Sequence, residues 1–278
     1  MRFIDLLING WYYFRVQLQQ HGLMKPLSIL SSTVATGISI FVGFLFIKYS
    51  FAGYFESLIK SMGYGNVIGF VVTGSLLSIL YQGLLNSVTF SLQDERRWGT
   101  LELLMLSGEK FFLFFLFFGR LLFGLMRYGI VLLSITVMVI VFFGSWINIQ
   151  ANIPVLILSL ILLIAATFFQ GIVAQSIVIQ SRKINPLYAA ILTLLNWFSG
   201  VTLPVEIFPR WIQIIVYMSP LTPGLKAVRR SLFSNGVNIE VDISILISQL
   251  IAYFMIATVF SLNFIEKALK RGEVTVRA

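Results

Sequence analysis

A charged segment lies between two long apolar stretches of this chain. Residues Gln93 to Leu104 read Gln-Asp-Glu-Arg-Arg-Trp-Gly-Thr-Leu-Glu-Leu-Leu and carry three carboxylates and two guanidiniums. Such side chains can form ion pairs and charge-assisted hydrogen bonds with a second protein. The same composition also fits an ordinary solvated loop, and the segment alone does not separate the two interpretations.

The residues that catalysis or metal binding needs are scarce. The chain has no cysteine, and its single histidine, His21, precedes the first apolar stretch without a second ligand nearby. No Gly-x4-Gly-Lys-Ser/Thr pattern is present, so the chain cannot bind and hydrolyse ATP by P-loop chemistry. We therefore expect no catalytic residue and no metal or cofactor site on this chain.

The elements that position the charged segment are membrane spans. Hydrophobic residues make up 58% of the 278 residues and charged residues only 11%, and the mean hydropathy is +0.92. These values indicate an all-α, polytopic membrane protein with a single domain over residues 1–278. The predicted spans are Leu27 to Ile47, Asn66 to Val88, Leu121 to Phe143, Pro154 to Gln180, Ile184 to Leu203 and Ile243 to Ile265.

Basic residues predict the orientation of these six spans. Thirteen of the 20 lysines and arginines fall on the side that holds both termini, and the positive-inside rule makes that side cytoplasmic. Six fall on the opposite side, where Lys226, Arg229 and Arg230 form a cluster without an assigned role. Arg127 lies within the third span, where we expect it to snorkel or to find a partner. No predicted span contains Asp or Glu in its interior, which disfavours ion-gradient-driven transport.

Two further segments are predicted beside the membrane. Residues 1–25 favour an interfacial helix, with an ordinary juxtamembrane anchor as the alternative. The phenylalanine-rich run from Phe111 to Phe118 is predicted to lie in the cytosolic interface with Arg120. It would connect the charged segment to the third span, or simply anchor the loop.

Polar residues recur on one face of the first two spans. The first span carries Ser32 and Thr36 on such a face, and the second carries Ser78, Gln82 and Asn86. Small and hydroxylated residues commonly let helices approach closely, and a pathway lining is the rival interpretation.

The segment after the fifth span should break the helix. It contains Gly200, Pro204, Pro209 and Pro220, and proline interrupts helical hydrogen bonding. Irregular backbone at membrane depth is tolerated only when protein or a water-filled cavity covers it. We predict short outer re-entrant helices within 204–240 that cap a cavity, ahead of a plain surface loop.

At these residues the chain resembles ABC-2 type permeases, the membrane subunits of ABC exporters. The first matching motif is Glu95 to Leu104 with Gly99-Thr100-Leu101-Glu102, followed by Leu106-Ser107-Gly108. The second runs from Ser199-Gly200 through Pro204 and Pro209-Arg210-Trp211 to Ser219-Pro220-Leu221-Thr222. The family often has Pro where this chain has Gly108, and typically Asn where it has Ser219. The resemblance covers essentially the whole chain.

The resemblance implies coupling to a separate ABC ATPase subunit that holds ATP and magnesium. Contacts would come from the segment 89–110 and the turn 181–186. The expected coupling residues are Glu95, Arg96, Arg97, Gly99, Thr100, Glu102, Arg182 and Lys183.

The resemblance also implies a dimer with a second copy or a homologous permease in the cell membrane. The pathway would lie between the copies, lined by the polar stripes above and by Asn196 of the fifth span. No residue of the spans indicates whether the substrate is a drug, a peptide, a lipid or a glycan. Their composition suits an amphipathic or lipid-linked cargo. A membrane scaffold or sensor subunit that only recruits a cytosolic protein is the alternative.

Overall fold

The computed structural model describes residues 67–97, 112–143, 151–178, 184–233 and 239–263, together with isolated positions between 34 and 64 and Gly99. Every regular element in these ranges is a helix. Four helices are long and apolar enough to cross a membrane: α4 (Val67–Thr89), α7 (Phe112–Phe143), α8 (Ile153–Val178) and α12 (Ile239–Ile256) with the π-helical stretch η3 (Ala257–Ser261). The all-α polytopic class predicted from composition is confirmed for the described residues.

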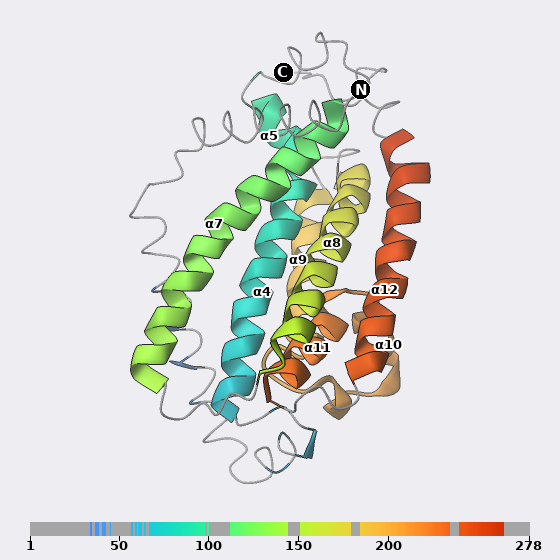
Figure 1. The fold of residues 1–278 in the computed structure, drawn as a ribbon. Helices are drawn as coiled ribbons and strands as arrows, with labels where there is room; N and C mark the ends of the chain where they lie inside the picture. The colour runs from blue at the N-terminus through green and yellow to red at the C-terminus, as the bar shows by residue number, and fades with distance from the viewer. Residues whose placement is uncertain are drawn as a thin grey trace.

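The long helices run side by side as one bundle (Figure 1). α4 packs against both α7 and α8, and α8 in turn packs against α12. The short helix α5 (Ser91–Arg97) lies at one end of the bundle, beside the start of α7. The short helices α10 (Arg210–Val216) and α11 (Leu221–Phe233) lie at the opposite end, which we call the α10 end.

Apolar side chains hold α4 between its neighbours. Leu84 and Val88 of α4 share one buried cluster with Leu92 of α5, Phe117 of α7 and Ile172 of α8. Within a membrane such side chains stabilise helix packing through van der Waals contacts, because lipid is as apolar as they are. α4 contributes buried side chains to three apolar clusters of the bundle.

Two span predictions closely match the observed helices. The second predicted span, Asn66 to Val88, corresponds to α4, and the fourth, Pro154 to Gln180, corresponds to α8. The first predicted span and the N-terminal helix fall mostly outside the described residues, although the described positions from 34 to 45 are helical.

The other boundaries need correction. The phenylalanine-rich run was predicted as a connector separate from the third span, but residues 112–143 form one continuous helix with Phe115 and Phe117 fully buried. The fifth span was predicted to reach Leu203, but α9 (Ile184–Phe198) ends five residues earlier. α12 begins at Ile239, ahead of the predicted Ile243, and so contains Glu240 and Asp242 in its first turn.

Candidate functional site

The end of the bundle that carries α5 is held together by an ion-pair cluster. Arg120 of α7 donates hydrogen bonds to Asp94 Oδ2 at 3.1 Å and to Glu95 Oε1 at 2.9 Å. Arg120 and Glu95 are each only 3% exposed. Removing one partner of a buried pair leaves an uncompensated charge and typically costs about 3–5 kcal/mol. The pair therefore fixes α5 to α7.

A second set of polar contacts fixes α5 to α8. Gln93 Nε2 donates to the carbonyl oxygen of Val178 at 3.3 Å. The Ser91 hydroxyl lies 3.5 Å from the amide oxygen of Gln175. α5 is therefore joined to both α7 and α8.

The predicted coupling residues lie differently in this arrangement. Glu95 is turned inward to Arg120, while Arg96 and Arg97 belong to α5 and Gly99 follows it with a φ of +69°. Thr100, Glu102, Arg182 and Lys183 lie outside the described residues. An ATPase contact by any of these residues stays a prediction.

The polar stripe of α4 meets α9. The Ser78 hydroxyl donates to Asn196 Oδ1 at 3.0 Å, and Gln82 Nε2 donates to Ser78 Oγ at 3.3 Å. Three of the predicted pathway residues are thus brought together, one turn before Asn86. Ser32 and Thr36 lie outside the described residues.

Sequence reasoning missed a second polar link from α4. The Tyr81 hydroxyl donates to Gln170 Oε1 of α8 at 2.9 Å and accepts from Ser219 Oγ at 3.0 Å. Gln170 shares no helix face with the other glutamines of α8, so periodicity alone could not find this contact. It ties α4 and α8 to the turn before α11.

A cavity of about 500 Å³ opens beside the ion-pair cluster. We call it the α5-end cavity. Its wall consists of Asn86, Ser87, Phe90, Gln93, Asp94, Arg120, Phe123, Arg127, Tyr128 and Ala189. It combines aromatic surface with charged and amide groups, which is typical of a ligand-binding site.

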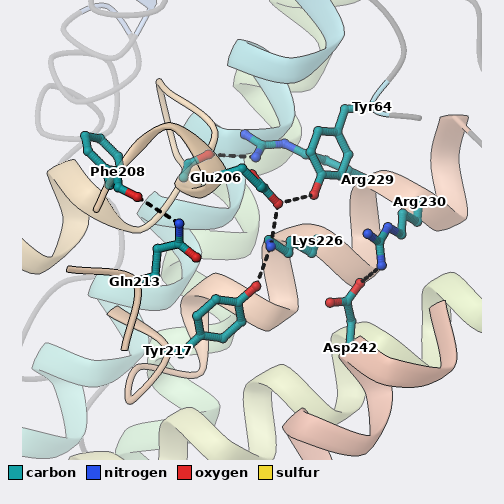
Figure 2. Close-up of polar contacts among 10 residues, drawn as sticks. Tyr64, Glu206, Phe208, Gln213, Tyr217, Lys226, Arg229, Arg230 and Asp242 are labelled. Atoms are coloured by element: carbon teal, nitrogen blue, oxygen red, sulfur yellow. Dashed lines mark hydrogen bonds and ion pairs between the residues drawn. The ribbon is translucent and has the colours of Figure 1, made fainter. Parts of the chain in front are cut away.

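The segment between α9 and α12 forms a network of charged side chains, several of them buried, at the α10 end of the bundle (Figure 2). Arg229 of α11 is 2% exposed. Its guanidinium donates to the carbonyl oxygens of Gly200 at 2.6 Å, Phe70 at 2.8 Å and Val201 at 3.0 Å, and to Thr73 Oγ1 at 3.2 Å. Burial lowers the pKa of Arg229 to about 9, which leaves the guanidinium protonated at neutral pH.

The two other cations of α11 form ion pairs. Lys226 Nζ lies 2.6 Å from Glu206 Oε1, and Arg230 Nη1 lies 2.5 Å from Asp242 Oδ2. Tyr64 donates a further hydrogen bond to Glu206 at 3.3 Å. Figure 2 shows Glu206 between Tyr64 and Lys226, with Arg230 and Asp242 beside them. The cluster that the topology left unassigned therefore joins α11 to α12 and to the 204–207 turn.

The predicted helix breakers explain the shape of this segment. Gly200 has a φ of +93°, which ends α9 in a conformation that favours glycine. Pro204 caps the short 3₁₀ helix η2 (Val205–Ile207) and Pro209 caps α10, while Pro220 immediately precedes α11. The short helices predicted after the fifth span are present, and their re-entry into a membrane stays a prediction.

Comparison with known proteins agrees with this architecture. Residues 111–233 match the family profile described as ABC-2 type transporter, a range that runs from the start of α7 to the end of α11. No curated protein matches the chain. The match supports the resemblance to ABC-2 type permeases and contains the second of the two sequence motifs. The domain is a membrane transport component, which supports a transporter permease subunit.

Proposed function

We propose that the chain is the membrane subunit of an ATP-driven ABC exporter, working as a dimer with a separate ATPase subunit. The observation that carries this proposal is the position of α5. It lies next to the family-matched region and is joined to α7 by the buried Arg120–Glu95 pair. A protein that binds at the α5 end would therefore act directly on two long helices.

The proposed coupling path starts beyond α5. Residues Gly99, Thr100 and Glu102 would contact the ATPase, with Arg182 and Lys183 as a second contact. Glu95 would act indirectly by holding α5 in place, because its carboxylate is occupied by Arg120 inside the chain. With this arrangement, movement of the ATPase changes the tilt of α7 and α8 relative to α4.

The proposed pathway follows the polar stripe of α4. Ser78, Gln82 and Asn196 form a hydrogen-bonded row between α4 and α9, and a second copy that faced this row would complete a polar lining. The exposed apolar side chains of α9, among them Leu187, Ile191 and Leu194, would contact lipid or that second copy. The cargo would be amphipathic or lipid-linked, and the location would be the cell membrane with both termini in the cytoplasm.

A charge reversal tests the coupling. Glu102→Arg should abolish substrate-stimulated ATP hydrolysis in the reconstituted complex while the chain still assembles in the membrane. The matched control is Glu240→Arg, because Glu240 is exposed in the first turn of α12 at the α10 end of the bundle. Unchanged stimulation in Glu102→Arg would refute the coupling role of this segment. A chain that never stimulates an ATPase would favour the scaffold alternative.

A further inference from the structure

Arg127 is exposed on α7 and has no carboxylate partner among the described residues. Its helix qualifies as a candidate span from Phe115 to Val137. At a rise of about 1.5 Å per residue, Arg127 lies roughly 18 Å from the start of that span. Its guanidinium lies 5.8 Å from the centroid of the Tyr128 ring. A charge near the middle of a membrane is unfavourable unless it faces a cavity or a partner.

The α5-end cavity is the place that Arg127 faces. The second guanidinium on the cavity wall, that of Arg120, forms ion pairs with Asp94 and Glu95. Asp94 is the one carboxylate on the cavity wall, and it is held by Arg120 at 3.1 Å. Arg127 therefore supplies the positive charge that a bound anion could neutralise, and the Asn86 amide lies on the same wall as a neutral hydrogen-bonding group.

The two helices beside this cavity, α4 and α7, are closely packed. A Cβ at Gly83 would lie 2.4 Å from the ring of Tyr128, and a Cβ at Gly124 would lie 2.7 Å from Ser87 Oγ. The glycines thus let α4 and α7 approach each other closely on two sides of the opening. A preformed cavity of about 500 Å³ falls within the usual size of small-molecule sites.

The two halves of the wall differ in polarity. Phe90, Phe123 and Tyr128 offer aromatic surface, whereas Arg127 and Asn86 offer hydrogen-bond donors. Guanidinium matches the geometry of phosphate oxygens and binds them through two parallel hydrogen bonds. The combination suits a molecule with one anionic group and an adjoining apolar part.

We propose that the α5-end cavity binds the phosphate-bearing head group of an amphipathic molecule, with Arg127 as its charged partner. This inference rests on the proposed permease function, since it names the chemical class of the cargo. A molecule entering from the α5 end would place its phosphate between Arg127 and Asn86 and its apolar part against the aromatic side chains.

Ligand binding can be measured without ATP or a partner protein. A negative binding result would therefore refute the ligand proposal and leave the exporter proposal untouched. The full chain in detergent is titrated with dioctanoyl phosphatidylglycerol, with dioctanoylglycerol, which lacks the phosphate, and with inorganic phosphate. Native mass spectrometry reports each occupancy. We expect saturable binding of the phosphatidylglycerol alone, weakened about tenfold or more in Arg127→Gln, because a hydrogen bond to a charged group is lost. Arg210→Gln is the control, since Arg210 is exposed at the start of α10.

Three results would overturn the proposal. Equal binding by wild type and Arg127→Gln would remove Arg127 from the site. Equal affinity for inorganic phosphate would contradict an amphipathic ligand, and equal affinity for dioctanoylglycerol would contradict an anionic one. If Arg127→Gln does not fold, Ala189→Leu narrows the cavity without changing its charge and should weaken the same binding. Unaltered binding in that variant would place the ligand elsewhere.

Discussion

Replacement of Arg229 by methionine should destabilise the α10 end of the bundle. Arg229 is the donor to the carbonyl oxygens of Gly200 and Val201, and both residues are buried. Methionine fills similar space but donates no hydrogen bond, so these two carbonyls lose a charged donor in a place that water does not reach.

The expected magnitude follows from those two bonds. A hydrogen bond to a charged group contributes about 1.5–3 kcal/mol, so the loss of two comes to roughly 3–6 kcal/mol. A contrary effect must be weighed, because burial of a charge is itself unfavourable and an apolar replacement can be neutral or stabilising. The loss should prevail here, because Arg229 is the donor that the described part of the chain offers to these two carbonyl oxygens, which lie beyond the end of α9 at Phe198.

The assay is equilibrium unfolding in mixed detergent micelles, with the midpoint compared between variants. Arg210→Met is the matched control, because Arg210 is exposed in the same segment and surface changes usually stay within about 0.5 kcal/mol. Arg229→Lys should fall between the two, since an ammonium keeps the charge but cannot reach all four acceptors. An Arg229→Met protein as stable as wild type would refute the reasoning.

Two further predictions concern the same end of the bundle. Gly74→Ala should destabilise by about 1–3 kcal/mol, since the new Cβ would lie 2.1 Å from the carbonyl oxygen of Val201. Gly129→Ala is the control, because no atom lies within 4 Å of the Cβ that it adds, and it should stabilise the folded chain by about 0.5–1 kcal/mol. Equal effects of the two substitutions in the same unfolding assay would contradict the packing argument. The second prediction is a pH dependence from Glu206. Burial raises its pKa, but the Lys226 ammonium and hydrogen bonds outweigh burial and lower the pKa below its ordinary value. The stabilisation is therefore present above about pH 4.5 and lost as the pH falls through the lowered pKa, so Glu206→Gln should flatten the acid limb of a stability profile. An acid limb identical to that of wild type would exclude Glu206 as its source.

Apolar length was sufficient to predict the helices whose ends depend on local sequence. α4 and α8 begin and end within a few residues of the predicted spans, because an apolar run of the right length predicts a membrane-spanning helix. The helix breaks at Gly200, Pro204 and Pro209 were predictable for a similar reason, since glycine and proline act on their own backbone.

Boundaries that depend on charge pairing were not predictable. The charge of Arg120 indicated a separate interfacial connector because its partners could not be predicted from the sequence. In the structure Arg120 of α7 forms ion pairs with Asp94 and Glu95 of α5. Asp242 likewise lies in α12 because Arg230 of α11 neutralises it. Each of these partners comes from a different helix, and no spacing along one helix reveals them.

In the candidate site, too, features set by one helix were predictable and features set by contacts between helices were not. Ser78 and Gln82 share a helix face that periodicity identifies, and their meeting with Asn196 follows from the packing of α4 and α9. Arg127 was expected to snorkel or to pair; it lines the α5-end cavity, and snorkelling stays a prediction. The walls of that cavity come from separate helices, so only the packed bundle brings them together.

The most direct test of the central claim is the mass of the intact complex. The tagged chain is purified from its native membrane in a mild detergent and weighed by native mass spectrometry. The proposal predicts two copies of the chain, or one copy with a homologous permease, together with two ATPase subunits, and ATP hydrolysis that disappears when those subunits are removed. Recovery of the chain with a protein that lacks an ATP-binding site, from several detergents, would contradict an ATP-driven permease.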